Sequence, residues 1–132
     1  KKARSLGALI VVGHGETLAE PVEQGTNMAY IKARVDILAH PGLISADEMK
    51  EAVKKGVHIE ITNRGGHSIS NGHVAALAKK LGARMLLNTD SHAPGDLISD
   101  ERAEKVALGA GLDKEDFRRI QQNALSLLKK IS

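Results

Sequence analysis

Cysteine and tryptophan are absent from these 132 residues, and tyrosine and phenylalanine occur once each. Without cysteine there are no disulfide bonds and no thiolate zinc site, which is typical of a cytoplasmic protein. Few aromatic side chains are present to stack on bases, and the 19 basic and 16 acidic residues are scattered along the chain. The composition therefore predicts a cytoplasmic protein that does not bind nucleic acid.

Long hydrophobic runs are also missing. The longest apolar run, Ala8 to Val12, is far too short to span a bilayer, and no secretory signal is visible. A hydrophobic content of 42% suits a compact core, so residues 1–132 are expected to form a single domain that does not contact membranes.

Short apolar segments alternate with helical stripes along the chain. Strands are expected over residues 6–12, 35–39, 57–62 and 84–89. Helices are expected from Thr26 to Ala33, from a Ser45 cap to Gly56, from a Ser70 cap to Gly82, from Ser99 or Asp100 to Leu108, and onward from Asp113. This alternation indicates an α/β fold of parallel βα repeats whose strand ends share one rim.

Histidine and aspartate side chains follow the ends of three of these strands. The positions are His14, His40, Asp90 and His92, and Pro41 is expected to hold His40 in an extended conformation. Imidazole and carboxylate ligands suit divalent zinc, manganese or iron ions. The sequence therefore predicts a metal site at the rim.

Other polar residues have supporting roles in this interpretation. Glu16 is a candidate to accept a hydrogen bond from the N–H of a ligating imidazole, and Arg64 and His67 can reach the rim to hold a phosphate. Glu60 lies on the polar face of an alternating strand and would need a partner if that face is buried. His58 and His73 are interpreted as ordinary surface or core residues.

Four segments, in this order, resemble the later part of a PHP-domain (polymerase and histidinol phosphatase) protein: VVGHGETLAEPVEQGTN, DILAHPGLIS, VHIEITNRGGHSISNGHVA and LLNTDSHAPGDLI. The resemblance implies the later part of a distorted seven-stranded β/α (TIM-like) barrel. It implies that His14 and His40 bind one metal ion, Asp90 a second and His92 a third, with Asp90 and His92 catalytic. The activity it implies is metal-dependent hydrolysis of a phosphorylated small molecule by a metal-bound hydroxide, similar to histidinol phosphatase.

The sequence also departs from that family. Its members carry a His-x-His strand, two further histidines and a Gly-x-Glu before the first of these segments, and none precedes His14. We therefore expect the carboxyl-terminal portion of a PHP domain, inactive alone, that self-associates or assembles with the missing amino-terminal part. A non-catalytic barrel fragment and an amidohydrolase-like metal hydrolase are the alternatives.

Overall fold

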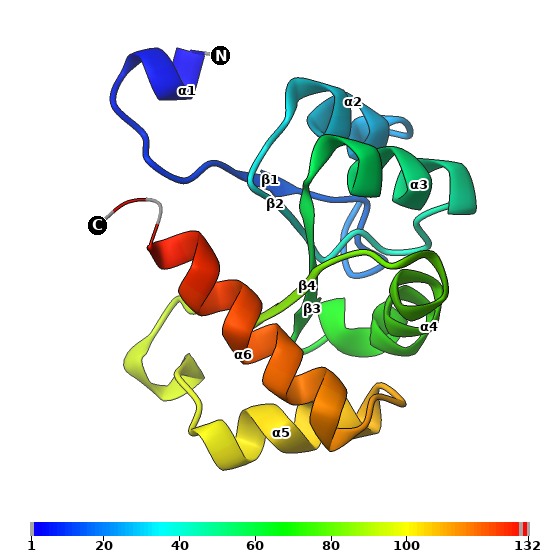
Figure 1. The fold of residues 1–132 in the computed structure, drawn as a ribbon, viewed down its shortest axis with the longest axis vertical. Coiled ribbons are helices and arrows are strands. Elements are labelled where there is room, and N and C mark those ends of the chain that lie inside the picture. Colours follow the sequence, from blue (N-terminus) through cyan, green and yellow to red (C-terminus); the bar gives the residue numbers. More distant parts are fainter. Residues whose placement is uncertain (1, 130, 132) are drawn as a thin grey trace.

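A computed structural model describes residues 2–129 and 131, which form a parallel sheet with helices on both sides (Figure 1). The strands are β1 (Val12–His14), β2 (Ile37–Ala39), β3 (His58–Thr62) and β4 (Met85–Asn88). The helices are α1 (Lys2–Ser5), α2 (Thr26–Ala33), α3 (Ala46–Lys55), α4 (Asn71–Leu81), α5 (Asp100–Gly109) and α6 (Lys114–Leu128), with short 3-10 helices η1 (His67–Ser70) and η2 (Pro94–Asp96).

The order and type of the main elements agree with the prediction, because their signals are local. Ser45 and Glu48 cap α3 reciprocally, and Asp113 and Asp116 cap α6 in the same way. Ser70 precedes α4 as expected, but its side chain makes no capping hydrogen bond.

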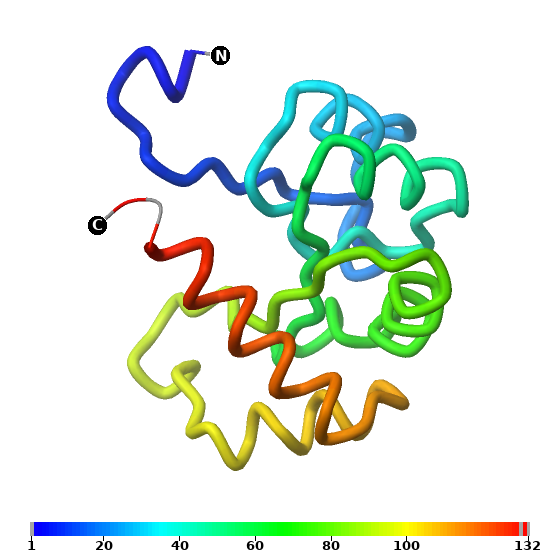
Figure 2. The backbone as a smooth tube through the Cα atoms, viewed as in Figure 1, coloured from blue at the N-terminus to red at the C-terminus, as the bar shows by residue number. Residues whose placement is uncertain are grey.

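The first strand begins later than the prediction. Residues 2–5 form the short helix α1, and the chain from there to β1 leaves Leu6 and Leu9 exposed. Figure 2 shows this segment extending away from the body of the molecule. Strand pairing starts only where the backbone of Val11 accepts hydrogen bonds from Asp36 and Ile37, because a strand requires a neighbour.

The two faces of the sheet have different surroundings. Ile59 and Ile61 point to the face covered by α2, α3 and α4, where they join the main core together with Leu38 (Figure 1). The alternate residues of the same strands point to the opposite face, as the period of two requires. There Ile37 and Leu86 form a smaller cluster with Leu127 of α6.

The expectation of a β/α barrel is wrong. The strands lie in the order β1-β2-β3-β4, so β1 and β4 occupy opposite edges of an open sheet. A closed barrel pairs its first and last strands, and β1 and β4 do not pair in the part of the chain that the structure describes, so these four strands do not close into a barrel. The edge at β4 is instead covered by α6, whose Asn123 donates a hydrogen bond to the carbonyl of Met85 at 3.0 Å.

None of the helices within residues 2–129 is both long and apolar enough to cross a membrane.

The face of β3 that α2, α3 and α4 cover lies at the centre of the main core, so a substitution there tests the fold. Ile59 is fully buried, so Ile59→Ala leaves a cavity and is expected to lower the free energy of unfolding by about 2–5 kcal/mol. Val53→Ala is the control, because Val53 lies on α3 with 41% of its surface exposed and should change stability by less than about 0.5 kcal/mol. Urea denaturation measures both, and equal effects would show that the core is placed incorrectly.

Candidate metal centre

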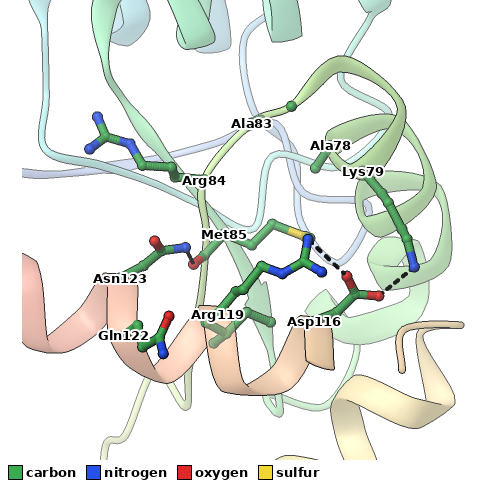
Figure 3. A pocket seen from close by; sticks show the side chains of 11 residues that line it. Ala78, Lys79, Ala83, Arg84, Met85, Asp116, Arg119, Gln122 and Asn123 are labelled. Carbon is green, nitrogen blue, oxygen red and sulfur yellow. Dashed lines mark hydrogen bonds and ion pairs between the residues drawn. The ribbon is translucent and has the colours of Figure 1, made fainter. Parts of the chain in front are cut away.

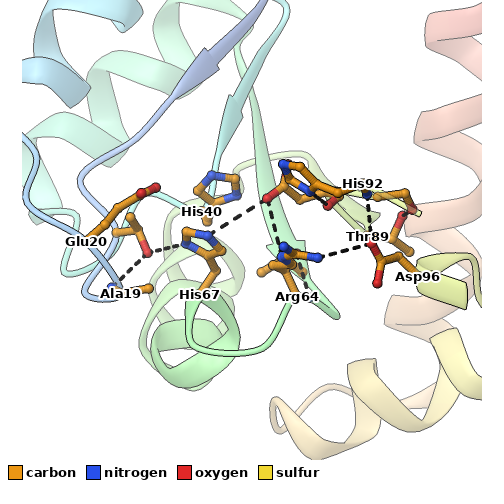
Figure 4. Close-up of polar contacts among 12 residues, drawn as sticks. Ala19, Glu20, His40, Arg64, His67, Thr89, His92 and Asp96 are labelled. Carbon is orange, nitrogen blue, oxygen red and sulfur yellow. Dashed lines mark hydrogen bonds and ion pairs between the residues drawn. The ribbon is translucent and has the colours of Figure 1, made fainter.

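Three side chains from distant parts of the sequence meet at the carboxyl end of the sheet. His40 follows β2, His67 begins η1 and Asp90 follows β4. One potential ligand atom of each lies within 4.8 Å of those of the other two. The rings of His40 and His67 are tilted by 31° to one another, and their centroids lie 4.3 Å apart. Figure 4 shows the two side chains next to each other.

Glu60 orients the ring of His40. Its Oε2 lies 2.8 Å from both the backbone N and the ring Nδ1 of His40, and its Oε1 accepts a hydrogen bond from Asn88 at 3.0 Å. Both His40 and Glu60 are almost completely buried. The Nε2 atom of His40 has no hydrogen-bond partner among the described residues. An imidazole fixed at one nitrogen by a carboxylate, with the other nitrogen available, has the arrangement of a typical metal ligand.

His67 is fixed in a similar way. Its Nδ1 hydrogen-bonds with the hydroxyl of Thr17 at 2.6 Å, and its Nε2 lies 3.9 Å from Oδ2 of Asp90. Burial lowers the pKa of His67 below its ordinary value, and the neighbouring His40 ring lowers it further. The neutral imidazole that a metal ion requires is therefore favoured.

The backbone is strained at two of the three residues. His40 has φ 31° and Asp90 has φ 46°, in the left-handed region that costs a non-glycine residue about 1–3 kcal/mol. The expectation that Pro41 holds His40 extended is therefore wrong, because the buried hydrogen bonds to Glu60 outweigh the local preference. Strain retained at clustered polar residues is typical of functional sites.

A close contact between loops keeps these residues in place. Gly42 has φ 60°, and a Cβ atom there would lie 1.8 Å from the carbonyl oxygen of Glu16. Only glycine therefore permits the turn after β2 to touch the turn after β1.

His14 and His92 lie outside the cluster of His40, His67 and Asp90. The ring of His14 lies edge-on to His40 at 4.6 Å, but its Nε2 pairs with Glu20 at 2.7 Å on the half-exposed side. His92 is exposed, and its Nδ1 donates a hydrogen bond to the carbonyl of Asp90 at 2.7 Å. Metal binding by these two histidines stays a prediction.

Arg64 and Glu16 contact other groups. Arg64 lies between two carboxylates, 3.8 Å from Asp90 and 3.1 Å from Asp96 (Figure 4). Glu16 accepts hydrogen bonds from the backbone N–H groups of Gly25 and Asn27, both at 2.9 Å, at the start of α2. Its carboxylate therefore stabilises a helix end, where negative charge is favoured.

Asp96 holds the loop that follows Asp90. Its Oδ2 accepts hydrogen bonds from the backbone N–H groups of His92, at 2.7 Å, and Ala93, at 3.0 Å. These bonds hold the pKa of Asp96 below its ordinary value. A charged Asp96 thus fixes the loop and Arg64 together beside the candidate ligands.

Sequence reasoning missed two contributors to this site. Glu60 was expected to need a partner, but alternation along a strand does not identify that partner as His40. Thr17 lies 50 positions from His67 and carries no sequence signal at all.

Two imidazoles and a carboxylate can hold a zinc, manganese or iron ion and leave a further position open. The orphaned Nε2 of His40 fits such an ion, since a buried nitrogen without a partner is costly. A depression of about 370 Å³ borders His40 and Asp90 and is lined in part by the apolar residues Val12 and Ile37. Ile37 belongs to the face of the sheet opposite α2, α3 and α4.

Comparison with known proteins finds similarity both in sequence and in fold. No protein-family model matches the chain. The chain is 52% identical over 133 residues to an uncharacterized protein of Methanocaldococcus jannaschii. The aligned region covers 99% of this chain and 61% of that protein. The chain thus spans about three fifths of the length of this relative. A chain in the cryo-EM structure of archaeal ribonuclease P with mature tRNA has the same fold, with a TM-score of 0.75 and 19% sequence identity. The superposed region covers 96% of this chain and 60% of that chain.

These comparisons correct the interpretation of the sequence. The resemblance to PHP-domain proteins is wrong, because no family model matches and the fold is that of a ribonuclease P chain. The phosphoesterase prediction that depended on it is wrong for the same reason, and so is the amidohydrolase alternative. The expected part of a β/α barrel, whether active or non-catalytic, is wrong because the fold matches a ribonuclease P chain over 96% of this chain. The expectation that nucleic acid is not a partner is also wrong, since the matching chain belongs to a complex with tRNA.

Proposed function

We propose that this chain is an RNA-binding domain of a ribonucleoprotein, where it contributes binding rather than cleavage. The observation that carries the proposal is the shared fold with a chain of archaeal ribonuclease P, which extends over 96% of the described protein at a TM-score of 0.75. The net charge of +3 and the sequence pI of about 9.3 give the domain the sign of charge that attracts RNA. The cytoplasmic location predicted from the sequence is compatible with an RNA partner.

Binding of a mature tRNA tests this proposal. We expect fluorescently labelled tRNA to bind at low salt, and the affinity to fall steeply as KCl is raised from roughly 50 to 200 mM, because phosphate contacts release counterions. Fluorescence anisotropy measures both quantities, and an uncharged polymer of similar size is the control. Absence of binding at low salt and at protein concentrations of about 100 μM would contradict the proposal.

We also propose that His40, His67 and Asp90 bind one divalent cation. The observation that favours it is the buried Nε2 of His40, which is oriented by Glu60 and has no partner among the described residues. The ion would join η1 to the ends of β2 and β4, so it would stabilise the rim without any catalytic step.

Calorimetric titration with zinc chloride tests the metal site. We expect one ion per chain, and His40→Ala, His67→Ala or Asp90→Asn should each weaken binding at least about tenfold. Glu60→Gln should weaken it by about 10–100-fold, because Glu60 orients the His40 ring without touching the metal.

His73→Ala is the matched control for these variants. His73 is exposed, and its Nε2 donates to the carbonyl of Ile44 at 2.8 Å, so its removal should leave zinc affinity unchanged. His14→Ala and His92→Ala measure whether the other two histidines take part. Unchanged affinity in the His40 and His67 variants would overturn the site.

A further inference from the structure

A groove of about 260 Å³ lies between the end of α4 and α6 (Figure 3). It is lined by Met85 at the start of β4, whereas Asp90 of the candidate metal centre follows the end of that strand. Its floor is apolar and includes Met85 and Ile120. Its charged lining consists of Lys79, Arg84, Arg119 and a single carboxylate, Asp116.

The carboxylate in this groove forms an ion pair with a lysine of the same groove, Lys79. Asp116 is 5% exposed, and its Oδ2 accepts hydrogen bonds from Lys79 Nζ at 2.6 Å and from the backbone N–H of Asp113 at 3.1 Å. The hydrogen bonds to Asp116 and Asp113 raise the pKa of Lys79, so the Lys79 ammonium group stays charged beside Asp116 at neutral pH. The two arginines therefore determine the sign of the charge that the groove presents.

Both arginines retain capacity to bind an anion. Arg84 is exposed and donates one hydrogen bond, to the carbonyl of Gly56 at 3.2 Å, and makes no ion pair with any described residue. Arg119 is 62% exposed and lies 3.6 Å from Glu115 and 4.0 Å from Asp116, distances at which an exposed pair contributes little. A guanidinium group matches the oxygens of a phosphate with two parallel donors.

The side of α6 that faces α5 has the opposite charge. The groove there is lined by three acidic residues, Asp100, Glu101 and Glu104, together with Lys114 and Arg118. A polyanion approaching α6 is thus attracted more strongly on the α4 side than on the α5 side.

The aromatic residues show which part of an RNA such a groove can contact. Phe117 is 8% exposed, and the ring of Tyr30 packs against Gly13 in the core. Neither ring is placed to stack on an unpaired base, which favours contacts to phosphates and sugars over stacking on bases.

We propose that the groove between α4 and α6 binds the sugar-phosphate backbone of folded RNA through Arg84 and Arg119, without reading the base sequence. This inference rests on the proposed RNA-binding function and adds the location and the chemistry of the contact.

The test compares variants that each lose positive charge, using labelled mature tRNA and anisotropy. Arg84→Ala combined with Arg119→Ala should raise the Kd at least about tenfold and lower the salt slope by about two, since each lost phosphate contact removes roughly one. Arg118→Ala is the matched control, because Arg118 is 69% exposed on the same helix but faces the acidic groove. Its Kd should stay within about twofold of the wild type.

A second arm compares two RNA hairpins of unrelated sequence and equal length, which should bind with Kd values within about threefold of each other. If tRNA binds but the double variant behaves like the wild type, the groove is not the site, although RNA binding stands. Equal losses in the double variant and in Arg118→Ala would also overturn the groove, because total charge would then explain them. A strong preference for one hairpin would overturn backbone recognition, and a wild-type protein that binds no RNA would overturn both proposals.

Discussion

The hydrogen bonds between Glu60 and His40 connect the two central strands of the sheet at the rim formed by their carboxyl ends. One carboxylate oxygen contacts both the backbone and the ring of His40, and the other contacts Asn88 of the next strand. A carboxylate buried to this extent would be very unfavourable without such partners. Satisfying it fixes the turn after β2 in a left-handed conformation and determines where Nε2 of His40 points.

The other parts of the rim are arranged around that ring. Parallel strands end at one edge of the sheet, so the segments after β2, β3 and β4 converge there. His67 approaches from η1 and is held by Thr17, which lies on the loop after β1. Three separate connections thus contribute to one cluster, and a bound cation would link them. The strain at His40 and Asp90 is the energetic consequence of bringing these groups together.

The proposed RNA contact is physically separate from this cluster. It depends on α6, which packs along β4 and contributes Arg119 to the groove that Arg84 also lines. Because α6 also faces α5, its two sides present different charges, positive toward α4 and acidic toward α5. The net charge of the domain therefore does not show that charge is distributed unevenly on the two sides of α6, because that distribution arises from the packing of the helices.

Local signals in the sequence determined the helices, their caps and the alternation of parallel strands. Ser45 with Glu48, and Asp113 with Asp116, act over three residues, so they are readable without a fold. The presence of histidines at the strand ends was readable for the same reason.

Tertiary structure alone decided that the sheet stays open, that His67 rather than the exposed His92 lies beside His40, and that Glu60 binds the His40 ring. It also decided the backbone of His40, which Pro41 should have kept extended. These features depend on contacts between residues 20 to 50 positions apart, and hydrophobic periodicity carries no information about which distant side chains meet. The buried hydrogen bonds formed in those contacts outweigh the local preferences on which sequence reasoning depends.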